Sequence, residues 1–412
     1  MNNFKKLRSS EYYIVFAVLQ LYIFGSIFYV FASGLPQPGD LLLCIGIAIG
    51  ALAYFGSNKT TVTPLFIIGA SFAACTFVIN MVNYIFISDK TFLFSSLYYI
   101  FNFFVFLFLK YLSEKEPEEF SQKIYVALLA AVFVELVFVY FISYKGLGSR
   151  AIGTFNNPNQ LSYWTLLSVG ILVALRYPYT FKTLDYFLLA ALFIMSLATL
   201  SKAGIIGIAF IVLCLVFTRL IGIIAKSVIL VALVMGSIYA LSDITNFFSQ
   251  AVQIEKVATV VDRFVSVQGD ESLEQRGYLR VFEQPQYLIL GAGEGGYERF
   301  SWPYEFHSGV GTLIFSYGIT GTLLFCAFIF LIFRNLPPIF WCTLFAMILY
   351  GLTHQNIRFT YFWVYLAICY WASITIPYKL EKLSNNRTQK LGMLRRDIPP
   401  EPAYQSNNVD AL

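Results

Sequence analysis

The chain has 412 residues, of which 58% are hydrophobic and only 12% are charged, and its formal net charge is +5. An ordinary soluble domain carries about 25% charged residues, so a chain this apolar cannot cover its surface in water. Apolar runs of membrane-spanning length recur along the sequence. The composition argues against a soluble protein. We attribute the positive charge to basic residues at a membrane face rather than to nucleic-acid binding.

The apolar runs predict an all-α polytopic membrane protein with about 12 transmembrane helices. Backbone groups in hydrocarbon must be hydrogen-bonded within their own segment, so each span is expected to be a helix. An even number of spans places both termini on one side. With the N-terminus inside, most basic residues of the short connections fall inside, as the positive-inside rule requires. The expected spans lie near 12–33, 40–56, 64–86, 92–112, 123–143, 160–176, 183–200, 203–224, 227–242, 307–333, 337–353 and 359–378.

These spans divide the chain into four parts. Residues 1–242 hold spans 1 to 9, and residues 307–378 hold spans 10 to 12. Between them, residues 243–306 form one large polar loop with short helices, on the outer face by this count. Residues 379–412 are polar and contain several prolines, which predicts a disordered cytoplasmic tail.

A first polar connection on the outer face, residues 148–160, follows span five. It contains Arg150 and an Asn157-Pro158 turn signal, and Asn159 can cap the helix that follows. Glu135 lies well inside span five itself. An ionisable group at that depth is a functional candidate, although it could equally be a buried group hydrogen-bonded to a neighbouring helix.

Three further polar positions lie at the ends of expected spans. The turn at 201–204 leaves Lys202 at the lipid–water boundary, where it could simply extend to the lipid headgroups. His307 opens span ten, and a helix N-terminus favours a neutral imidazole that is able to take a proton. His354, near Arg358, is expected to have a capping or packing role.

In the large loop, a short helix is predicted from Ser272 to Gln284, ended by the proline that follows. Arg276 and Arg280 would share one of its faces at i and i+4, where like charges repel. Such a pair needs an anionic partner. The alternative is that Glu274 or Glu283 neutralises the two arginines within the helix.

Two other segments of this loop have recognisable patterns. Phe248–Phe264 has apolar residues at helical spacing, which predicts an amphipathic helix on the membrane surface. The glycine-rich run Gly291–Gly296 is no dinucleotide site, because it lacks the strand before and the helix after that such a site needs. We interpret it as a flexible bend that would let the preceding helix move over a ligand.

Four motifs, in this order between Gly148 and Gly321, resemble those of the O-antigen ligase and O-antigen polymerase superfamily of bacterial envelope enzymes. Each motif alone is weak, but their order and their common membrane face make the combination more specific. They are Arg150 with Gly153-Thr-Phe-Asn-Asn-Pro-Asn159, Ser201-Lys-Ala-Gly204, Arg276 to Pro285 with Gly291-Ala-Gly293, and His307-Ser308 with Tyr317-Gly-Ile-Thr-Gly321.

The resemblance implies a fold related to the GT-C class, in the bacterial inner (cytoplasmic) membrane, with both termini cytoplasmic and the active site periplasmic. It implies a metal-independent, inverting glycosyltransferase without a cofactor. Such enzymes move a glycan from an undecaprenyl diphosphate carrier to an acceptor hydroxyl. The expected partners are the lipid-linked oligosaccharide donor, the glycan acceptor and, for a polymerase, a chain-length regulator protein. Nucleic acid is not expected.

The same resemblance assigns roles to residues. His307 is the expected base and Arg276 the main catalytic cation, while Lys202, Arg150 and Arg280 are expected to bind the diphosphate. Lys202 stands where the family usually has arginine. A lysine keeps the charge but lacks the bidentate fork that suits phosphate. Residues with a structural role, or a supporting one in the site, are Asn157, Asn159 and Glu135.

Three functions remain open on the sequence. A repeat-unit polymerase of O-antigen, exopolysaccharide or capsule is favoured by the Asn-Asn-Pro-Asn loop. A ligase that attaches O-antigen to lipid A-core shares the same motifs. A transporter or flippase of lipid-linked sugars would need several ionisable residues at mid-depth, whereas the charges here gather at one face.

Overall fold

The computed structural model describes residues 9–32, 34–55, 62–143, 149–228, 276–301 and 303–396. The regular structure in these ranges is helical and no strand occurs there, which confirms the all-α prediction. Three short helices are α12 (Leu279–Glu283), η2 (Pro285–Tyr287) and η3 (Tyr297–Arg299). The others are α1 (Ser9–Gly25), α2 (Pro38–Phe55), α3 (Pro64–Ile87), α4 (Thr91–Lys115), α5 (Pro117–Val137) with its π-helical continuation η1 (Phe138–Ser143), α6 (Pro158–Arg176), α7 (Thr183–Ala198), α8 (Lys202–Val216), α13 (Gly309–Ser316), α14 (Gly318–Phe333), α15 (Pro338–Thr353) and α16 (Thr360–Arg396).

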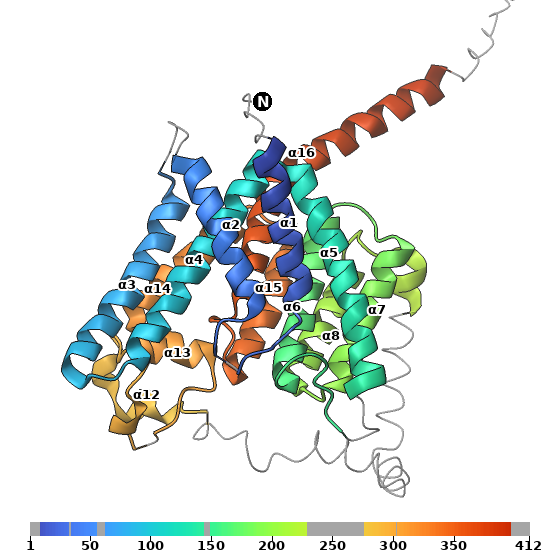
Figure 1. Cartoon of the computed structure of the whole chain (residues 1–412). Helices are drawn as coiled ribbons and strands as arrows, with labels where there is room; N and C mark the ends of the chain where they lie inside the picture. The colour runs from blue at the N-terminus through green and yellow to red at the C-terminus, as the bar shows by residue number, and fades with distance from the viewer. Residues whose placement is uncertain are drawn as a thin grey trace, which may run out of the picture.

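The long helices stand side by side and alternate in direction, so every second connection comes to the same end of the bundle (Figure 1). The N-terminus and the far end of α16 lie at the upper end in this view. The connections that carry the unusual polar residues lie at the lower end, and they are 88–90, 149–157, 199–201, 276–308 and 354–359.

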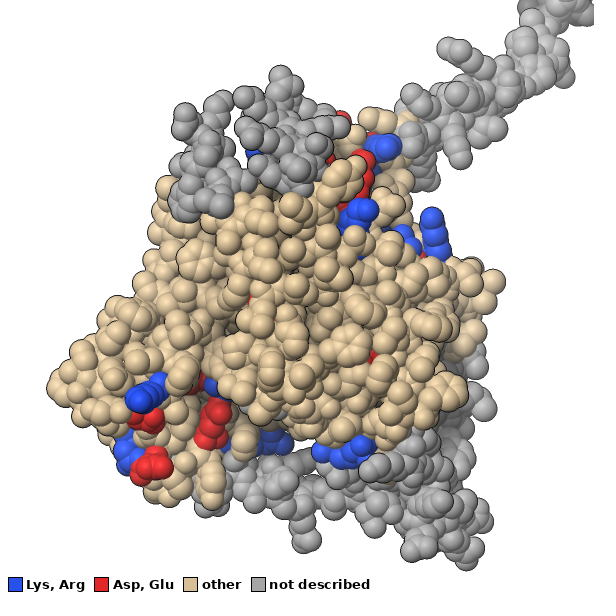
Figure 2. All heavy atoms as spheres, in the orientation of Figure 1, with Lys and Arg blue, Asp and Glu red and all other residues tan. Residues whose placement is uncertain are grey.

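Three helices of the described chain are long and apolar enough to cross a membrane: α3, α4 and the continuous unit α5–η1. Among the shorter apolar helices, α7 packs against α5 and α14 packs against α3, whereas α8 and α15 pack against α6 and against each other. Large apolar side chains point outward along the bundle, for example Phe133 at 59% exposure and Phe330 at 54%. On the face shown in Figure 2, charged residues gather at the two ends and the broad middle is almost free of them. This distribution fits a protein whose middle lies in lipid.

The centre of the bundle is α6, in which every residue from Leu161 to Leu175 is buried. It packs against α5, α7, α8, α15 and α16, which together surround it. Trp164 is fully buried and donates its indole N–H to Ser26 Oγ (3.1 Å). A helix enclosed in this way fixes the positions of the loops at both its ends, and the lower of these loops is 149–157.

Local sequence explains where several helices begin. A proline at the first helical position opens α3, α5, α6 and α15, where its missing N–H costs nothing. Three N-cap side chains accept a hydrogen bond from the first turn: Thr63, Asn157 and Ser308. The cap of α6 is therefore Asn157, which accepts from Gln160 N (2.9 Å), and not Asn159 as predicted.

Three predicted spans have clearly different limits in the structure. The eighth ends at Val216 rather than near residue 224. The first span ends at Gly25 rather than near residue 33, because the Gln37 side chain bonds the Phe31 and Leu35 backbone and holds 26–37 as a loop. The tenth span is divided into α13 and α14 at Gly318, whose φ is +61°. A Cβ there would come within 2.4 Å of the Ile289 carbonyl oxygen. The helix breaks where it packs against that backbone.

The predicted disordered tail is wrong for residues 379–396, because α16 continues through Arg396. This stretch lacks proline and is rich in Leu, Lys and Arg, which favour helix. The remaining tail, the predicted ninth span from residue 229 onward and the predicted amphipathic helix Phe248–Phe264 lie outside the described residues.

Candidate functional site

The segment 276–309 is fastened at both of its ends to the C-terminus of α15. Carbonyl groups at a helix C-terminus have no partner within the helix, and four consecutive ones here accept hydrogen bonds from this segment. The pairs are Arg276 Nη1 to Thr353 O, Tyr278 Oη to Leu352 O (2.8 Å), Ser308 Oγ to Gly351 O (2.9 Å) and Gly309 N to His354 O (3.0 Å). Arg276 and His307, 31 positions apart in the sequence, are thereby brought to one helix end.

Arg150 reaches the same place from the other side of the bundle. Its Nε donates to the Thr199 carbonyl oxygen (2.9 Å), and its Nη2 donates to Asn159 Oδ1 (2.6 Å). The carbonyl oxygen of Asn159 accepts from the hydroxyl of Tyr350 (2.7 Å), one turn before the end of α15. These contacts connect the ends of α6, α7 and α15 through one guanidinium group.

Glu135 holds the loop that carries Arg150. It is fully buried and accepts hydrogen bonds from Thr154 N (3.1 Å) and Thr154 Oγ1 (2.6 Å). The neighbouring Gly153 has φ +57°, and a Cβ there would collide with the Glu135 carboxylate. The structure therefore gives Glu135 the second of its two expected roles, as a buried group that is hydrogen-bonded to another part of the chain.

His354 lies at the centre of these residues. Its ring stacks on Tyr350 with 4.7 Å between the ring centroids, and its Nδ1 is 2.8 Å from Thr353 Oγ1. Burial, followed by the charges of Arg276, Arg150 and His307, lowers the pKa of His354 to about 3. Two of these groups, Arg276 and Arg150, carry a permanent positive charge. The imidazole is therefore neutral at ordinary pH and surrounded by groups suited to an anion.

His307 is exposed, directly before Ser308, which caps α13 by accepting from Gly311 N (2.9 Å). Within the described ranges its ring makes no hydrogen bond. Lys202 is the first residue of α8 and is partly buried. It follows Thr199, the acceptor of Arg150, by three positions. His307 lies in the connection 276–308, and Lys202 directly follows the connection 199–201. Both residues therefore lie at the lower end of the bundle, as do Arg150, Arg276 and His354.

Arg280 does not join this cluster. Residues 272–275 of the predicted helix lie outside the described residues, 276–278 form a turn, and α12 begins at Leu279. Arg276 lies in a turn before α12, so the two arginines do not share a helical face. Only 1% of Arg280 is exposed. Its guanidinium carbon is 4.7 Å from the Phe306 ring centroid and 5.1 Å from that of Phe300, and Nη2 donates to the Tyr304 carbonyl oxygen (2.6 Å). It joins α12 to the segment before α13.

The glycine-rich run Gly291–Gly296, for which a flexible bend was predicted, is hydrogen-bonded to and packed against the junction of α13 and α14. Ala292 N and Gly293 N donate to the carbonyl oxygens of Phe315 and Ser316, both at 2.9 Å. A Cβ on Gly291, whose φ is +90°, would come within 2.3 Å of the Ser316 carbonyl oxygen. The glycines allow close backbone contact at the junction of α13 and α14.

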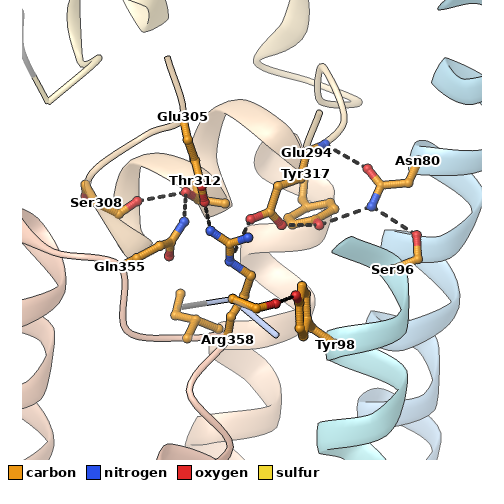
Figure 3. A network of polar contacts seen from close by, with 12 residues as sticks. Asn80, Ser96, Tyr98, Glu294, Glu305, Ser308, Thr312, Tyr317, Gln355 and Arg358 are labelled. Atoms are coloured by element: carbon orange, nitrogen blue, oxygen red, sulfur yellow. Dashed lines mark hydrogen bonds and ion pairs between the residues drawn. The ribbon is translucent and has the colours of Figure 1, made fainter. Parts of the chain in front are cut away.

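A buried polar network holds the same run against α3 and α4 (Figure 3). Glu294 is fully buried; it accepts from the Tyr317 hydroxyl (2.6 Å) and its backbone N–H donates to Asn80 Oδ1 (2.8 Å). Arg358 points between two carboxylates, with Nε 3.2 Å from Glu294 Oε1 and Nη2 against Glu305. Burial is the largest single influence and lowers the pKa of Arg358, but Glu294 and the nearby tyrosines together outweigh it, and the net pKa is raised.

Compared with known proteins, the chain matches no protein-family model and no curated protein. Membership of the family suggested by the four motifs is therefore a proposal.

His354 caps the C-terminus of α15 and stacks on Tyr350, as the predicted capping or packing role requires. Sequence reasoning missed its surroundings and the whole Arg358 network, because a lone histidine after an apolar helix gave no sign that Arg150 and Arg276 would lie near it. The one available signal was the spacing of His354 and Arg358, four residues apart in a polar turn at the expected outer face. Chemically, the cluster around His354 offers cations for an anionic group and neutral nitrogen atoms that are able to take a proton.

Proposed function

We propose that this protein is a membrane glycosyltransferase that moves a glycan from a polyprenyl-diphosphate carrier to the hydroxyl of an acceptor sugar. Its favoured activity is polymerisation of polysaccharide repeat units on the periplasmic face of the bacterial inner membrane. The observation that carries this proposal is the convergence of Arg150, Arg276 and His307 around His354 at one end of an apolar bundle. The motif resemblance to the O-antigen enzymes supports it.

The chemistry fits the residues present. A departing lipid diphosphate develops negative charge, and fixed cations in a partly dry site stabilise that charge in the transition state. Arg276 and Arg150 supply this charge, and Lys202 adds to it from the start of α8. Both arginines are held in place by carbonyl groups at helix ends, so little reorganisation is needed when a substrate binds.

The nucleophile is a hydroxyl group of the acceptor sugar. A positioned base accelerates such an attack by about 10²–10⁴-fold, and His307 is that base because it is exposed at the mouth of the cluster. The acceptor O–H bond breaks as the new C–O bond forms, and the diphosphate leaves with the bonding electron pair. Direct displacement of this kind inverts the anomeric carbon.

The position of the cluster suits a donor that is anchored in lipid. The polyprenyl chain of the donor stays in the hydrocarbon, and its diphosphate lies at the membrane surface. Large outward-facing side chains along the bundle are apolar, whereas the connections 149–157 and 276–308, which contain Arg150, Arg276 and His307, lie at its lower end (Figure 1). A diphosphate at the bilayer surface would meet these residues without leaving its own leaflet.

The test is glycan transfer by the full chain purified in detergent, supplied with a polyprenyl-diphosphate oligosaccharide and followed by mass spectrometry. We expect elongated lipid-linked products and release of polyprenyl diphosphate. His307→Ala is expected to lower the rate at least about 100-fold, whereas Arg334→Ala, an exposed residue at the other end of the bundle, keeps it. Absence of any transfer by the unmodified protein, or an undiminished rate for His307→Ala, contradicts the proposal.

The same assay separates polymerase from ligase. With the lipid-linked oligosaccharide as both donor and acceptor, a polymerase forms longer chains. A ligase forms product only when lipid A-core is added. A protein that moves such lipids across sealed vesicles but joins no sugars in detergent would be a transporter instead.

A further inference from the structure

The proposed function leaves His354 without a role, yet its surroundings determine its chemistry. The hydroxyl of Thr353 has one proton, which it donates to the Tyr350 carbonyl oxygen at 3.2 Å. Its oxygen is then free to accept from Nδ1–H of His354, 2.8 Å away. This arrangement places the proton of the neutral imidazole on Nδ1 and leaves the lone pair on Nε2. In the described part of the chain, Nε2 has no hydrogen-bond partner.

The ring itself has little freedom. Tyr350 stacks on it at 4.7 Å and is stacked in turn by Tyr163 at 4.5 Å between centroids. The backbone carbonyl of His354 is bonded to Gly309 N (3.0 Å). With Nδ1, the ring face and the backbone all fixed, Nε2 has a defined direction, as a group that binds a ligand requires.

The charges that face His354 come from three other segments: Arg276 before α12, Arg150 before α6 and His307 before α13. In the free protein, burial first and these groups second keep the imidazole neutral. A bound anion reverses this balance, because a unit negative charge about 4 Å away raises a pKa by about 3 at an effective dielectric constant of about 20. The C-terminal end of α15 also favours a positive charge at this position.

We propose that His354 is a further diphosphate-binding residue, which takes a proton from solvent onto Nε2 when the anion binds and then donates that proton in a hydrogen bond to a phosphate oxygen. The step forms one N–H bond and needs no other reactant. It rests on the proposed function in one respect, since the natural ligand would be the diphosphate of the lipid-linked donor. The proton stays on His354 while His307 acts on the acceptor hydroxyl.

As a consequence, His354 becomes a cation only when the substrate is bound. Arg150 and Arg276 carry permanent charge, and a third permanent charge between them would be repelled. A histidine avoids this cost in the empty site and still supplies a charged donor to the leaving group. Charge-assisted hydrogen bonds of this kind are about twice as strong as neutral ones.

The chain has two histidines, so ¹⁵N-histidine labelling of the full protein in detergent gives two sets of ring signals. His307→Gln assigns them. Without ligand, we expect the His354 signals to be those of a neutral Nδ1–H ring from pH 8 to pH 5. With saturating inorganic pyrophosphate and no metal ion, the protonation midpoint should rise by about 3, to near pH 6. An ordinary midpoint near 6.5 in the free protein, or one that pyrophosphate does not move, overturns the proposal.

Pyrophosphate affinity gives a second readout. His354→Gln is expected to bind about 10-fold more weakly than the unmodified protein at pH 5, where the bound histidine is charged, and equally at pH 8, where it is neutral. Arg276→Gln weakens binding at both pH values and serves as the comparison. An equal loss at both pH values for His354→Gln would mean a merely structural role and would refute the proposal.

These outcomes are separate from those of the glycan assay. Pyrophosphate-dependent protonation of His354 without glycan transfer would leave the anion site standing and remove the proposed function. Glycan transfer without protonation of His354 would support the proposed function and refute the role of His354 in binding the anion.

Discussion

His354 and Arg358 lie four residues apart in the connection between α15 and α16, and they have opposite surroundings. Arg358 lies between Glu294 and Glu305, so its charge is already balanced within the fold (Figure 3). His354 lies near His307 and the two arginines Arg150 and Arg276, whose positive charges have, among the described residues, no carboxylate between them and the imidazole. One turn of the chain thus separates a region of paired charges from a region of like charges.

The difference teaches which charges hold the fold and which are available to a ligand. A buried charge that has an internal partner does not require anything from outside. Like charges held together raise the free energy of the empty protein, and an anion removes that cost when it binds. By this criterion, Arg358 and Arg280 belong to the framework, and the residues around His354 form the site.

The largest expected effect concerns the framework. Gly291→Ala places a Cβ at φ +90° and within 2.3 Å of the Ser316 carbonyl oxygen, so backbone must move. We expect a loss on the order of 4 kcal/mol in the free energy of unfolding, from strain and overpacking together. Thermal unfolding in detergent measures it. Gly25→Ala, with no atom within 4 Å of the added Cβ, should change stability by less than about 1 kcal/mol. If both variants had the same stability, the interpretation of Gly291–Gly296 as a flexible bend would be favoured instead.

The second effect concerns the site. Arg276→Ala removes a cation that the proposed transition state requires, and we expect transfer to fall about 10²–10³-fold with little change in unfolding temperature. Arg280→Ala should do the opposite, because it empties a cage of aromatic rings and lowers the amount of folded protein. Both variants are tested by measuring the glycan transfer rate and dividing it by the amount of folded protein. If Arg280→Ala lost transfer while remaining stable, the division between framework and site would be wrong.

A third prediction tests the balance of charge at Arg358. Glu294→Gln keeps the shape of the side chain but leaves the guanidinium with Glu305 alone. Because Arg358 is 21% exposed, we expect a cost of about 3 kcal/mol in unfolding free energy, at the lower end for a broken buried pair. Glu298→Gln, at an exposed position in η3, is the control and should be neutral. A neutral effect of Glu294→Gln would show that the pair contributes nothing to the framework.

The smallest effect is expected at Lys202. Lys202→Arg keeps the charge and should leave the transfer rate within about 3-fold, whereas Lys202→Ala should lower it about 10-fold. The measurement is the initial rate at saturating donor. A normal rate for Lys202→Ala would mean that this lysine only reaches the lipid headgroups.

Much of the fold could be predicted because apolar length is a strong signal. The helices α3, α4 and α6 begin and end within a few residues of their predicted limits. The break at Gly318 could not be predicted, because its cause is the Ile289 carbonyl oxygen, which lies outside that helix. The extension of α16 was missed because a polar sequence was taken as disordered, although its residues favour helix.

The site could be predicted only in part. Arg150, Arg276 and His307 were proposed from motifs that local sequence makes visible, and the structure places them at one end of the bundle. The burial of Arg280 was missed, since Phe300 and Phe306 follow it by 20 residues or more. His354 was missed for the same physical reason: its pKa depends on charges from three segments that meet only in three dimensions.

The enclosure of α6 has a consequence for biosynthesis. Its hydroxyl-bearing residues Ser162, Thr165 and Ser168 are all buried, and α15 and α16, which cover part of it, leave the ribosome last. During insertion, part of the surface of α6 therefore contacts lipid or a chaperone until α15 and α16 are inserted. A chain that terminates before Thr360 never acquires the final cover, and cellular proteolysis should remove it even though its first spans are complete.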